Sequence, residues 1–335
     1  MGGQWLPLVW LGLIAFAIFM YVLLDGFVLG SGILFSFVPT DHNRDTMMTS
    51  VAPIWDGNET WLVLGAGGLF AVFPLAYSII LPALYLPFMI MLLGLVFRGV
   101  AFEFRFKARK RGKRIWDRAF QWGSIVATFA QGVVLGAFVQ GFELHGTRYV
   151  GGSFGWLTPF GILAGLALVA GYALLGSTWL IMKTSGDLES WARRTSSHLL
   201  LLVLAFIGAI SIWVPFLDND IAARWFSLPN FYFLSQVPLF TLLVGYLHWR
   251  ATRSGTHVQP FLLTMALFTL GYAGLAISLW PNIVPHEIPF WEAAATASSQ
   301  RFLLVGVSIT LPAVLFYTAY SYYVFRGKVQ QPTGY

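Results

Sequence analysis

The sequence predicts an all-α polytopic membrane protein with nine transmembrane helices, organised as one integral membrane domain over residues 1–335. Of its 335 residues, 57% are hydrophobic and only 10% are charged. A soluble domain cannot bury that much apolar surface, so lipid must replace water around most of the chain. The chain has no cysteine, which excludes disulfides, iron–sulfur ligation, covalent c-type haem attachment and a thiol nucleophile.

Apolar segments long enough to cross a bilayer recur along the whole chain, because roughly 20 helical residues span a ~30 Å hydrocarbon core. The predicted spans are 7–37, 57–73, 80–104, 122–142, 156–182, 198–217, 227–248, 259–281 and 300–325. Proline marks the turn expected between the second and third spans, at Pro74 and Pro82. The N-terminus lacks a basic segment and a cleavage site, so we expect a retained first span rather than a signal peptide.

The distribution of lysine and arginine predicts the orientation. Sixteen of the 20 basic residues fall in the C-terminal tail or in the loops after the odd-numbered spans, and eight of these lie in 105–118. Only Arg148, Arg224 and Arg301 fall on the opposite side. Cytoplasmic loops carry the excess of Lys and Arg. The sequence therefore predicts a periplasmic N-terminus, a cytoplasmic C-terminus and an odd number of spans.

Ionisable residues gather on the first three predicted spans. They are Asp25, Asp56, Glu59, Arg98 and Glu103. Charged groups inside a bilayer are costly and usually have a partner or a function. On the predicted topology all five lie in the inner leaflet, and Asp56 and Glu59 share a helix face. Such a group can hold and release a proton near neutral pH.

A structural alternative stays open for these residues. Acids in the first turn of a helix complement its dipole, and Arg98 with Glu103 would form an interfacial ion pair. The six histidines fall in predicted loops or at span edges, and none stands mid-span opposite a second axial ligand. We therefore expect neither haem ligation nor a metal site in this chain. Phosphate-binding loops and nucleophile elbows are also absent from the sequence.

Three motifs carry a family resemblance. "DGFVLGSGIL" begins at Asp25, "SVAPIWDGNETWLVLGAGGLFAVFP" runs through the second span, and "FRGVAFEFR" ends the third. Together with the nine-span plan, they resemble subunit II of the cytochrome bd-type quinol oxidases over the whole chain. The short chain and the "NETW" form resemble the cyanide-insensitive branch. Trp55, Asn58 and Trp61 of the second motif are expected to serve packing or an interface.

This resemblance implies a fold of two four-helix bundles plus a peripheral helix, in a bacterial inner membrane. It implies a heterodimer with a haem-bearing subunit I, which carries haems b and d and the quinol-binding loop. The complex would oxidise ubiquinol and reduce oxygen to water electrogenically in the aerobic respiratory chain. The present chain would be haem-free and non-catalytic alone. The resemblance also allows a small single-span accessory subunit and a structural quinone among lipids, and it implies no nucleic acid.

The resemblance assigns roles to individual residues. Asp56 matches the family's proton-pathway aspartate, Asp25 its "DGF" aspartate and Arg98 its "FR" arginine, within a cytoplasmic proton route that supports subunit I. Some members carry a second acid where this chain has Leu29, which puts in doubt a relay that needs that group.

Two other functions are compatible with the residues themselves. A secondary transporter binds ions at intramembrane acids beside broken helices, although here the charges cluster in one leaflet and no inverted repeat is evident. A purely structural assembly subunit would use the same acids as ion pairs.

Overall fold

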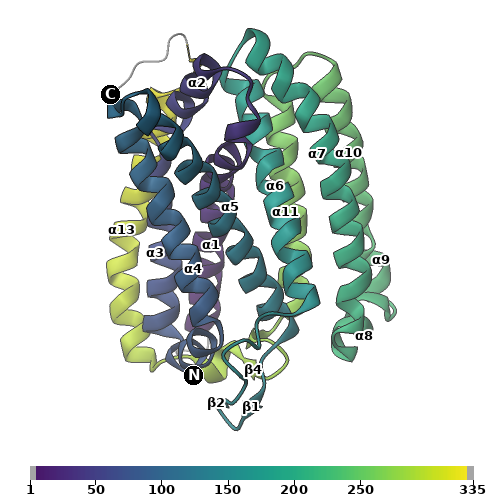
Figure 1. Cartoon of the computed structure of the whole chain (residues 1–335). Helices are drawn as coiled ribbons and strands as arrows, with labels where there is room; N and C mark the ends of the chain where they lie inside the picture. The colour runs from purple at the N-terminus through teal and green to yellow at the C-terminus, as the bar shows by residue number, and fades with distance from the viewer. Residues whose placement is uncertain (1–4, 330–335) are drawn as a thin grey trace.

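The computed structural model describes residues 5–329, apart from the side chains at positions 110 and 111, and this part of the chain is mainly helical (Figure 1). The long helices are α1 (Leu6–Leu34), α3 (Trp55–Val72), α4 (Pro74–Lys107), α5 (Lys110–Gln140), α6 (Pro159–Lys183), α7 (Gly186–Trp213), α10 (Gln236–Arg253), α11 (Gln259–Leu279) and α13 (Ala297–Val324). The short helices are α2 (Asp41–Val51), α8 (Asn219–Phe226), α9 (Asn230–Leu234) and α12 (Phe290–Ala293), with 3-10 turns η1 (Phe35–Phe37) and η2 (Val214–Phe216). Two antiparallel hairpins pair β1 (Leu144–His145) with β2 (Arg148–Tyr149), and β3 (Asn282–Val284) with β4 (Ile288–Pro289).

The predicted class, an all-α polytopic membrane protein, is confirmed. Within residues 5–329, eight helical segments are long and apolar enough to cross a membrane. They correspond to eight of the nine predicted spans. The other predicted span, 57–73, is the helix α3, whose first turns carry Asp56, Asn58 and Glu59 and lower its hydropathy. The count of nine membrane crossings and the orientation of the termini stay predictions.

Several predicted boundaries are wrong, because an apolar run reports the thickness of the membrane rather than the end of a helix. Pro82 lies inside α4, which begins at Pro74; a lipid-embedded helix tolerates such a proline because its neighbours satisfy the freed backbone groups. The basic loop expected after residue 104 is also absent, since α4 continues to Lys107 and α5 starts at Lys110. Lysine and arginine favour helix in water, so both helices continue past the predicted hydrocarbon core.

The long helices form two groups that meet at α1, α5 and α6. One group contains α1, α3, α4 and α5, with α13 along its edge, and the other contains α6, α7, α10 and α11 (Figure 1). This arrangement agrees with the two bundles and peripheral helix that the family resemblance implies. The start of α1 and both hairpins lie at one end of the molecule, whereas α2 and the end of α13 lie at the other.

Glycines allow the two groups to approach closely. Where α1 crosses α6, a Cβ atom on Gly30 would lie 1.7 Å from the carbonyl oxygen of Tyr172, and one on Gly176 would lie 2.4 Å from the carbonyl carbon of Gly30. Residues without side chains let helix backbones touch in a bilayer, where packing rather than the hydrophobic effect drives association. The small-residue spacing at Gly26 and Gly30 therefore reflects this helix crossing.

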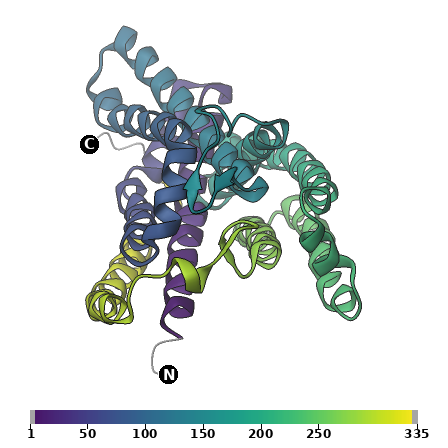
Figure 2. The ribbon, with the colours of Figure 1, turned by 90° about the horizontal axis from the view of Figure 1, so that it is seen from below.

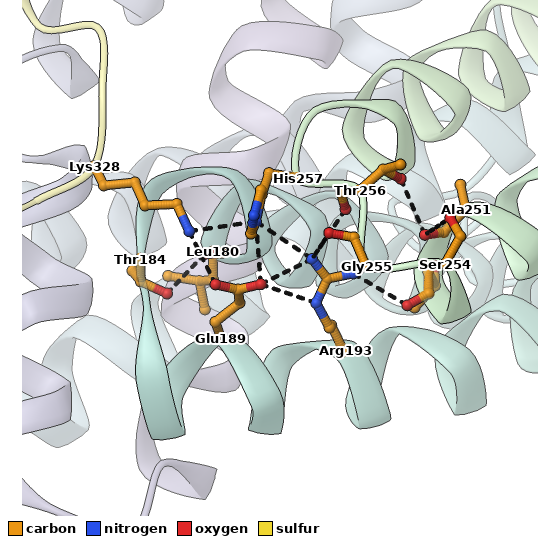
Figure 3. Close-up of polar contacts among 11 residues, drawn as sticks. Leu180, Thr184, Glu189, Arg193, Ala251, Ser254, Gly255, Thr256, His257 and Lys328 are labelled. Carbon is orange, nitrogen blue, oxygen red and sulfur yellow. Dashed lines mark hydrogen bonds and ion pairs between the residues drawn. The ribbon is translucent and has the colours of Figure 1, made fainter.

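The segment that follows α13 is attached to the second helix group by a polar cluster around Lys328 (Figure 3). Lys328 donates to Glu189 Oε2 at 2.9 Å, and Arg193 donates to Glu189 Oε1 at 2.8 Å. Arg193 also donates to the carbonyl oxygens that follow α10, including those of Gly255 and Thr256. The tail thus joins α13 to the first turn of α7 and, through Glu189 and Arg193, to the α10–α11 loop.

Replacing Gly30 with alanine should weaken the protein, because the new methyl group would collide with backbone atoms of α6 that cannot rotate away. Overpacking of this kind costs about 1–3 kcal/mol or more. We expect a lower unfolding temperature for the detergent-solubilised complex. Gly12→Ala, on the same helix where a Cβ atom meets nothing within 4 Å, is the matched control. Equal melting of the Gly30 and Gly12 variants would contradict the close crossing.

Candidate functional site

A buried arginine lies at the centre of the candidate site. Arg98 of α4 has no exposed side-chain surface, and its Nη1 donates to Asp25 Oδ1 of α1 at 2.6 Å. Its Nη2 donates to Glu59 of α3. One guanidinium therefore holds two carboxylates that come from two other helices. The predicted meeting of Asp25, Glu59 and Arg98 is present in the structure.

The exposure of the three acids changes stepwise from the protein surface to its interior. Asp56 is exposed in the first turn of α3. The Glu59 side chain is 31% exposed, and that of Asp25 is fully buried. Asp56 makes no ion pair with any residue described between 5 and 329, although it lies near enough to Glu59 for charge repulsion. From the start of α3 to the buried arginine, the three acids are thus progressively less exposed.

Asn58 connects this cluster to its surroundings. It is buried, its Nδ2 donates to the carbonyl oxygen of Leu24 at 2.8 Å, and its Oδ1 accepts from Tyr322 of α13 at 3.1 Å. Leu24 directly precedes Asp25 in α1. Asn58 therefore sets the position of α3 against the turn that carries Asp25, and it also attaches α13.

The two tryptophans of the motif pack on different sides of α3, Trp55 against α4 and Trp61 against α1. Trp55 stacks on Phe102 with ring centroids 5.0 Å apart, and the Arg98 guanidinium lies over its ring at 5.7 Å. Trp61 is fully buried and meets Phe16 edge to face at 5.7 Å. Both side chains serve packing within this chain, and Trp55 also covers the guanidinium with an aromatic face.

Glu103 does not join the site, so the sequence-based expectation that it converges with the other four residues is wrong. Its side chain is 67% exposed and pairs at 3.4 Å with Lys107 on the same helix. Arg98 and Glu103 are five residues apart, and five residues turn an α-helix by about 140° beyond one full turn. The interfacial pair suggested between them is therefore absent, and the partner of Glu103 lies one turn along the helix.

Sequence reasoning missed a buried hydrogen-bond chain next to Asp25. Gln131 of α5 donates from Nε2 to Tyr21 Oη at 2.8 Å, and it accepts at Oε1 from Tyr172 of α6 at 3.1 Å. Tyr21 precedes Asp25 by four residues and so shares its helix face, which was the one available signal. The chain joins α1, α5 and α6 around the buried acid.

Sequence reasoning also missed a second buried arginine, which lies beyond the predicted inner end of the third span. Arg105 of α4 has no exposed side-chain surface; its Nε donates to Asp117 Oδ1 at 2.5 Å and its Nη1 to Asp45 Oδ1 at 2.7 Å. Lys113 donates to Asp45 Oδ2 at 3.0 Å. The short helix α2, which leads to Asp56, is thereby attached to α4 and α5. Arg105 looked like one charge of a solvated loop because the loop was expected to be long.

The charge balance of the site allows it to bind a proton. Two carboxylates around one guanidinium leave one negative charge that a proton can neutralise. No group of three or more His, Cys, Asp or Glu side chains that would hold a metal ion occurs in the described part of the chain.

Comparison with known proteins places this chain in a family. Residues 6–325 match the family described as cytochrome bd terminal oxidase subunit II. The chain belongs to this family. This subunit II chain is 26% identical to cytochrome bd-I ubiquinol oxidase subunit 2 of Escherichia coli (strain K12), over 97% of its own length and 95% of the relative. It is 28% identical to cytochrome bd ubiquinol oxidase subunit 2 of Bacillus subtilis (strain 168), over 96% of each chain.

The fold of this subunit II chain is shared with a solved structure. The structural match to a chain of "The structure of bd oxidase from Geobacillus thermodenitrificans" covers 95% of this chain and 97% of that one. Its TM-score is 0.75, and the two sequences are 15% identical. The predicted family is therefore confirmed. The protein is a multi-pass subunit of a quinol:oxygen oxidoreductase in the bacterial inner membrane, and as subunit II it has a subunit I as its partner.

Replacing Arg98 with glutamine should strongly destabilise this subunit, because Asp25 would stay buried without its cation. Breaking a buried ion pair by removing one partner costs roughly 3–5 kcal/mol. We expect a large fall in the unfolding temperature or in the yield of assembled complex. Lys107→Gln, which breaks an exposed pair, is the control and should have little effect. The double variant Arg98→Gln with Asp25→Asn should recover part of the loss, and no recovery would contradict the pairing.

The Asp45 cluster predicts an acid-dependent stability. Burial alone would raise the pKa of Asp45, but hydrogen bonds from Lys113 and Arg105 outweigh it and lower the pKa below its usual range. The native state thus binds fewer protons at this group than the unfolded chain does. The stabilisation should be complete above about pH 4, the ordinary carboxyl value, and should be lost as the pH falls through the lowered pKa.

Asp45→Asn tests this directly. The difference in unfolding temperature between the wild-type complex and the variant should be largest near pH 7 and should shrink below about pH 4. Asp41→Asn, in an exposed pair with Arg44 of the same helix, is the control. A difference that does not depend on pH would refute the contribution of this carboxylate.

Proposed function

We propose that this chain is the haem-free subunit of a bd-type ubiquinol oxidase, and that it gives the haem-bearing partner a cytoplasmic proton route. Reduction of oxygen to water consumes protons, and taking them from the cytoplasm would make the reaction electrogenic. The relatives from E. coli and B. subtilis are named ubiquinol oxidase subunits, and we extend that substrate to the complex of this chain. The chain would also support the fold of its partner.

One observation carries the proposal: the acids around Arg98 become progressively more buried. Asp56 is exposed, Glu59 is partly exposed and Asp25 is fully buried. Asp56 would take a proton from water, and Glu59 would pass it towards Asp25. Arg98 stays protonated at any physiological pH, so it does not carry the proton itself. Its role is to hold Glu59 and Asp25 side by side and to balance the charge of one of them.

The surroundings of the site favour the same direction of transfer. The first turn of α3, which carries Asp56, lies at the end of the molecule that also holds α2 and the connection between α4 and α5 (Figure 1), which is the predicted cytoplasmic side. Asn58 and Trp55 fix the first turn of α3 against α1 and α4. A leucine at position 29, fully buried, supplies no further acid, so the route would leave Asp25 by another path.

A structural role is the second candidate, because direct pairing of Arg98 with both acids is also what an assembly function would use. The two functions differ in their readouts. A structural role predicts that Asp25→Asn and Glu59→Gln lower the amount of assembled, haem-containing complex but leave turnover per haem unchanged. A proton route predicts slower turnover in complexes that retain every haem.

Asp56→Asn is the most direct test, since the exposed carboxylate makes no ion pair with any described residue and its loss should not disturb folding. Positioned acid–base groups contribute roughly 100-fold or more to proton transfer, so we expect quinol-driven oxygen uptake to fall at least about tenfold. Haem content, read from the optical spectrum of the purified complex, should stay normal.

Glu103→Gln is the matched control, because it removes an acid of α4 that lies outside the cluster, and it should leave oxygen uptake unchanged. Normal turnover of the Asp56 variant with a full haem complement would refute the route. Loss of haems would point instead to an assembly function.

The chain purified without its partner should show no haem absorption; a Soret band there would refute the haem-free assignment.

A further inference from the structure

The basic segment between α4 and α5 divides into two sets of side chains. Arg105, Lys107 and Lys113 are paired with acids of this chain. Arg114 and Arg118 are exposed, and neither forms a hydrogen bond or ion pair with any residue described between 5 and 329. Arg109 is exposed and unpaired within residues 5–329 as well, but it precedes α5, whereas Arg114 and Arg118 are both on that helix.

These two arginines lie on one face of α5, one helical turn apart. Residues four apart on a helix have Cβ atoms about 5–6 Å from each other, a spacing at which two guanidinium groups can contact one phosphate. Trp122 lies one turn further along the same face, with 60% of its surface exposed, and Ile115 beside Arg118 is 67% exposed. Ile125 and Phe129 continue this face as partly exposed apolar residues. Cationic groups are therefore followed along the helix by an indole and then by an apolar strip.

Arg114, Arg118 and Trp122 lie at a height along α5 that matches the edge of a bilayer. Gln140 ends the helix near the hairpins at the opposite end of the molecule. At 1.5 Å per residue, Arg118 lies about 33 Å from it, close to the ~30 Å thickness of the hydrocarbon core. Arg114 and Arg118 then stand at headgroup level, and Trp122 stands at the level where interfacial tryptophans occur. The turns around the α4–α5 connection project from the side of the bundle (blue, upper left in Figure 2), away from α7 and α10.

We propose that Arg114, Arg118 and Trp122 form a binding site for the headgroup of an anionic phospholipid. Both guanidinium groups would donate to the phosphodiester oxygens in the bidentate geometry that arginine favours. The Trp122 ring would lie against the glycerol region, and the acyl chains would follow Ile125 and Phe129. Asp117, on the same turns of α5, accepts from Arg105 of α4, so the site is built on a fixed helix.

The chemistry favours a lipid over a free anion. A soluble phosphate would use only the two arginines, and it would leave the exposed indole and the apolar strip without a partner. A phospholipid matches all three parts in the order in which they occur along the helix. An anionic headgroup also balances charges that nothing described in this chain neutralises.

Native mass spectrometry of the delipidated complex, purified with its haem-bearing partner, tests the proposal. Phosphatidylglycerol and phosphatidylcholine would be titrated separately into the detergent-solubilised complex. Each arginine near a membrane surface strengthens anionic lipid binding several-fold, so Arg114→Gln with Arg118→Gln should weaken retention of one phosphatidylglycerol roughly 25-fold. Binding of phosphatidylcholine should not change.

Two further variants make the result decisive. Arg114→Lys with Arg118→Lys keeps the charge and should recover part of the binding. Lys107→Gln, which removes an exposed but paired charge on α4, should bind phosphatidylglycerol as the wild type does. Haem spectra report whether each complex has assembled.

Three outcomes would overturn the proposal. The first is equal retention of phosphatidylglycerol by the wild type and the glutamine double variant. The second is displacement of the lipid by millimolar inorganic phosphate, which would indicate a site for free anions. The third is a wild-type complex that retains no anionic lipid, which would mean that the partner subunit covers this face.

Discussion

The arrangement of this protein depends on the burial of Arg98. A charge without a partner is very costly inside a membrane protein, so the guanidinium has to be accompanied by carboxylates. Asp25 and Glu59 meet this requirement from two different helices. The ion pairs therefore specify how α1, α3 and α4 are placed around one point. Asn58 extends the same constraint to α13 through Tyr322. A single buried cation thus sets the relative positions of four helices and brings together the acids from which the proposed proton route is built.

A second buried arginine collects carboxylates beyond the predicted membrane surface, and it positions different helices. Arg105 is as buried as Arg98, but its acids come from α2 and α5. It attaches the short helix that precedes α3, and so it supports the start of the path at Asp56. One helix, α4, carries both buried arginines two turns apart, and each collects carboxylates from its own neighbours. Arg114 and Arg118 of the same segment are exposed, and they form the site that we propose for an anionic lipid.

Membership of the subunit II family agrees with this organisation of charge. The chain shares a fold with a bd oxidase although only 15% of residues are identical in that comparison. Most of the sequence needs only to be apolar and of suitable size, because lipid accepts many such side chains. The buried polar residues are more demanding, since each needs a partner with defined geometry. The "WDGNETW" segment supplies three contacts of defined geometry: Glu59 pairs with Arg98, Asn58 links α1 to α13, and Trp55 covers the guanidinium.

The amino-acid sequence by itself determined that the chain lies in a membrane, which of its segments are apolar helices, and that Asp25, Glu59 and Arg98 belong together. These follow from hydropathy and from the cost of intramembrane charge, which are properties of single residues and their neighbours along the chain. The tertiary structure alone decided that Glu103 points away, that Arg105 is buried, and that Gln131 links Tyr21 to Tyr172. It also decided where helices end, because helix hydrogen bonds continue in water after the apolar residues stop. Contacts between distant segments depend on helix rotation and crossing, and these are set by close backbone packing at residues such as Gly30 and Gly176.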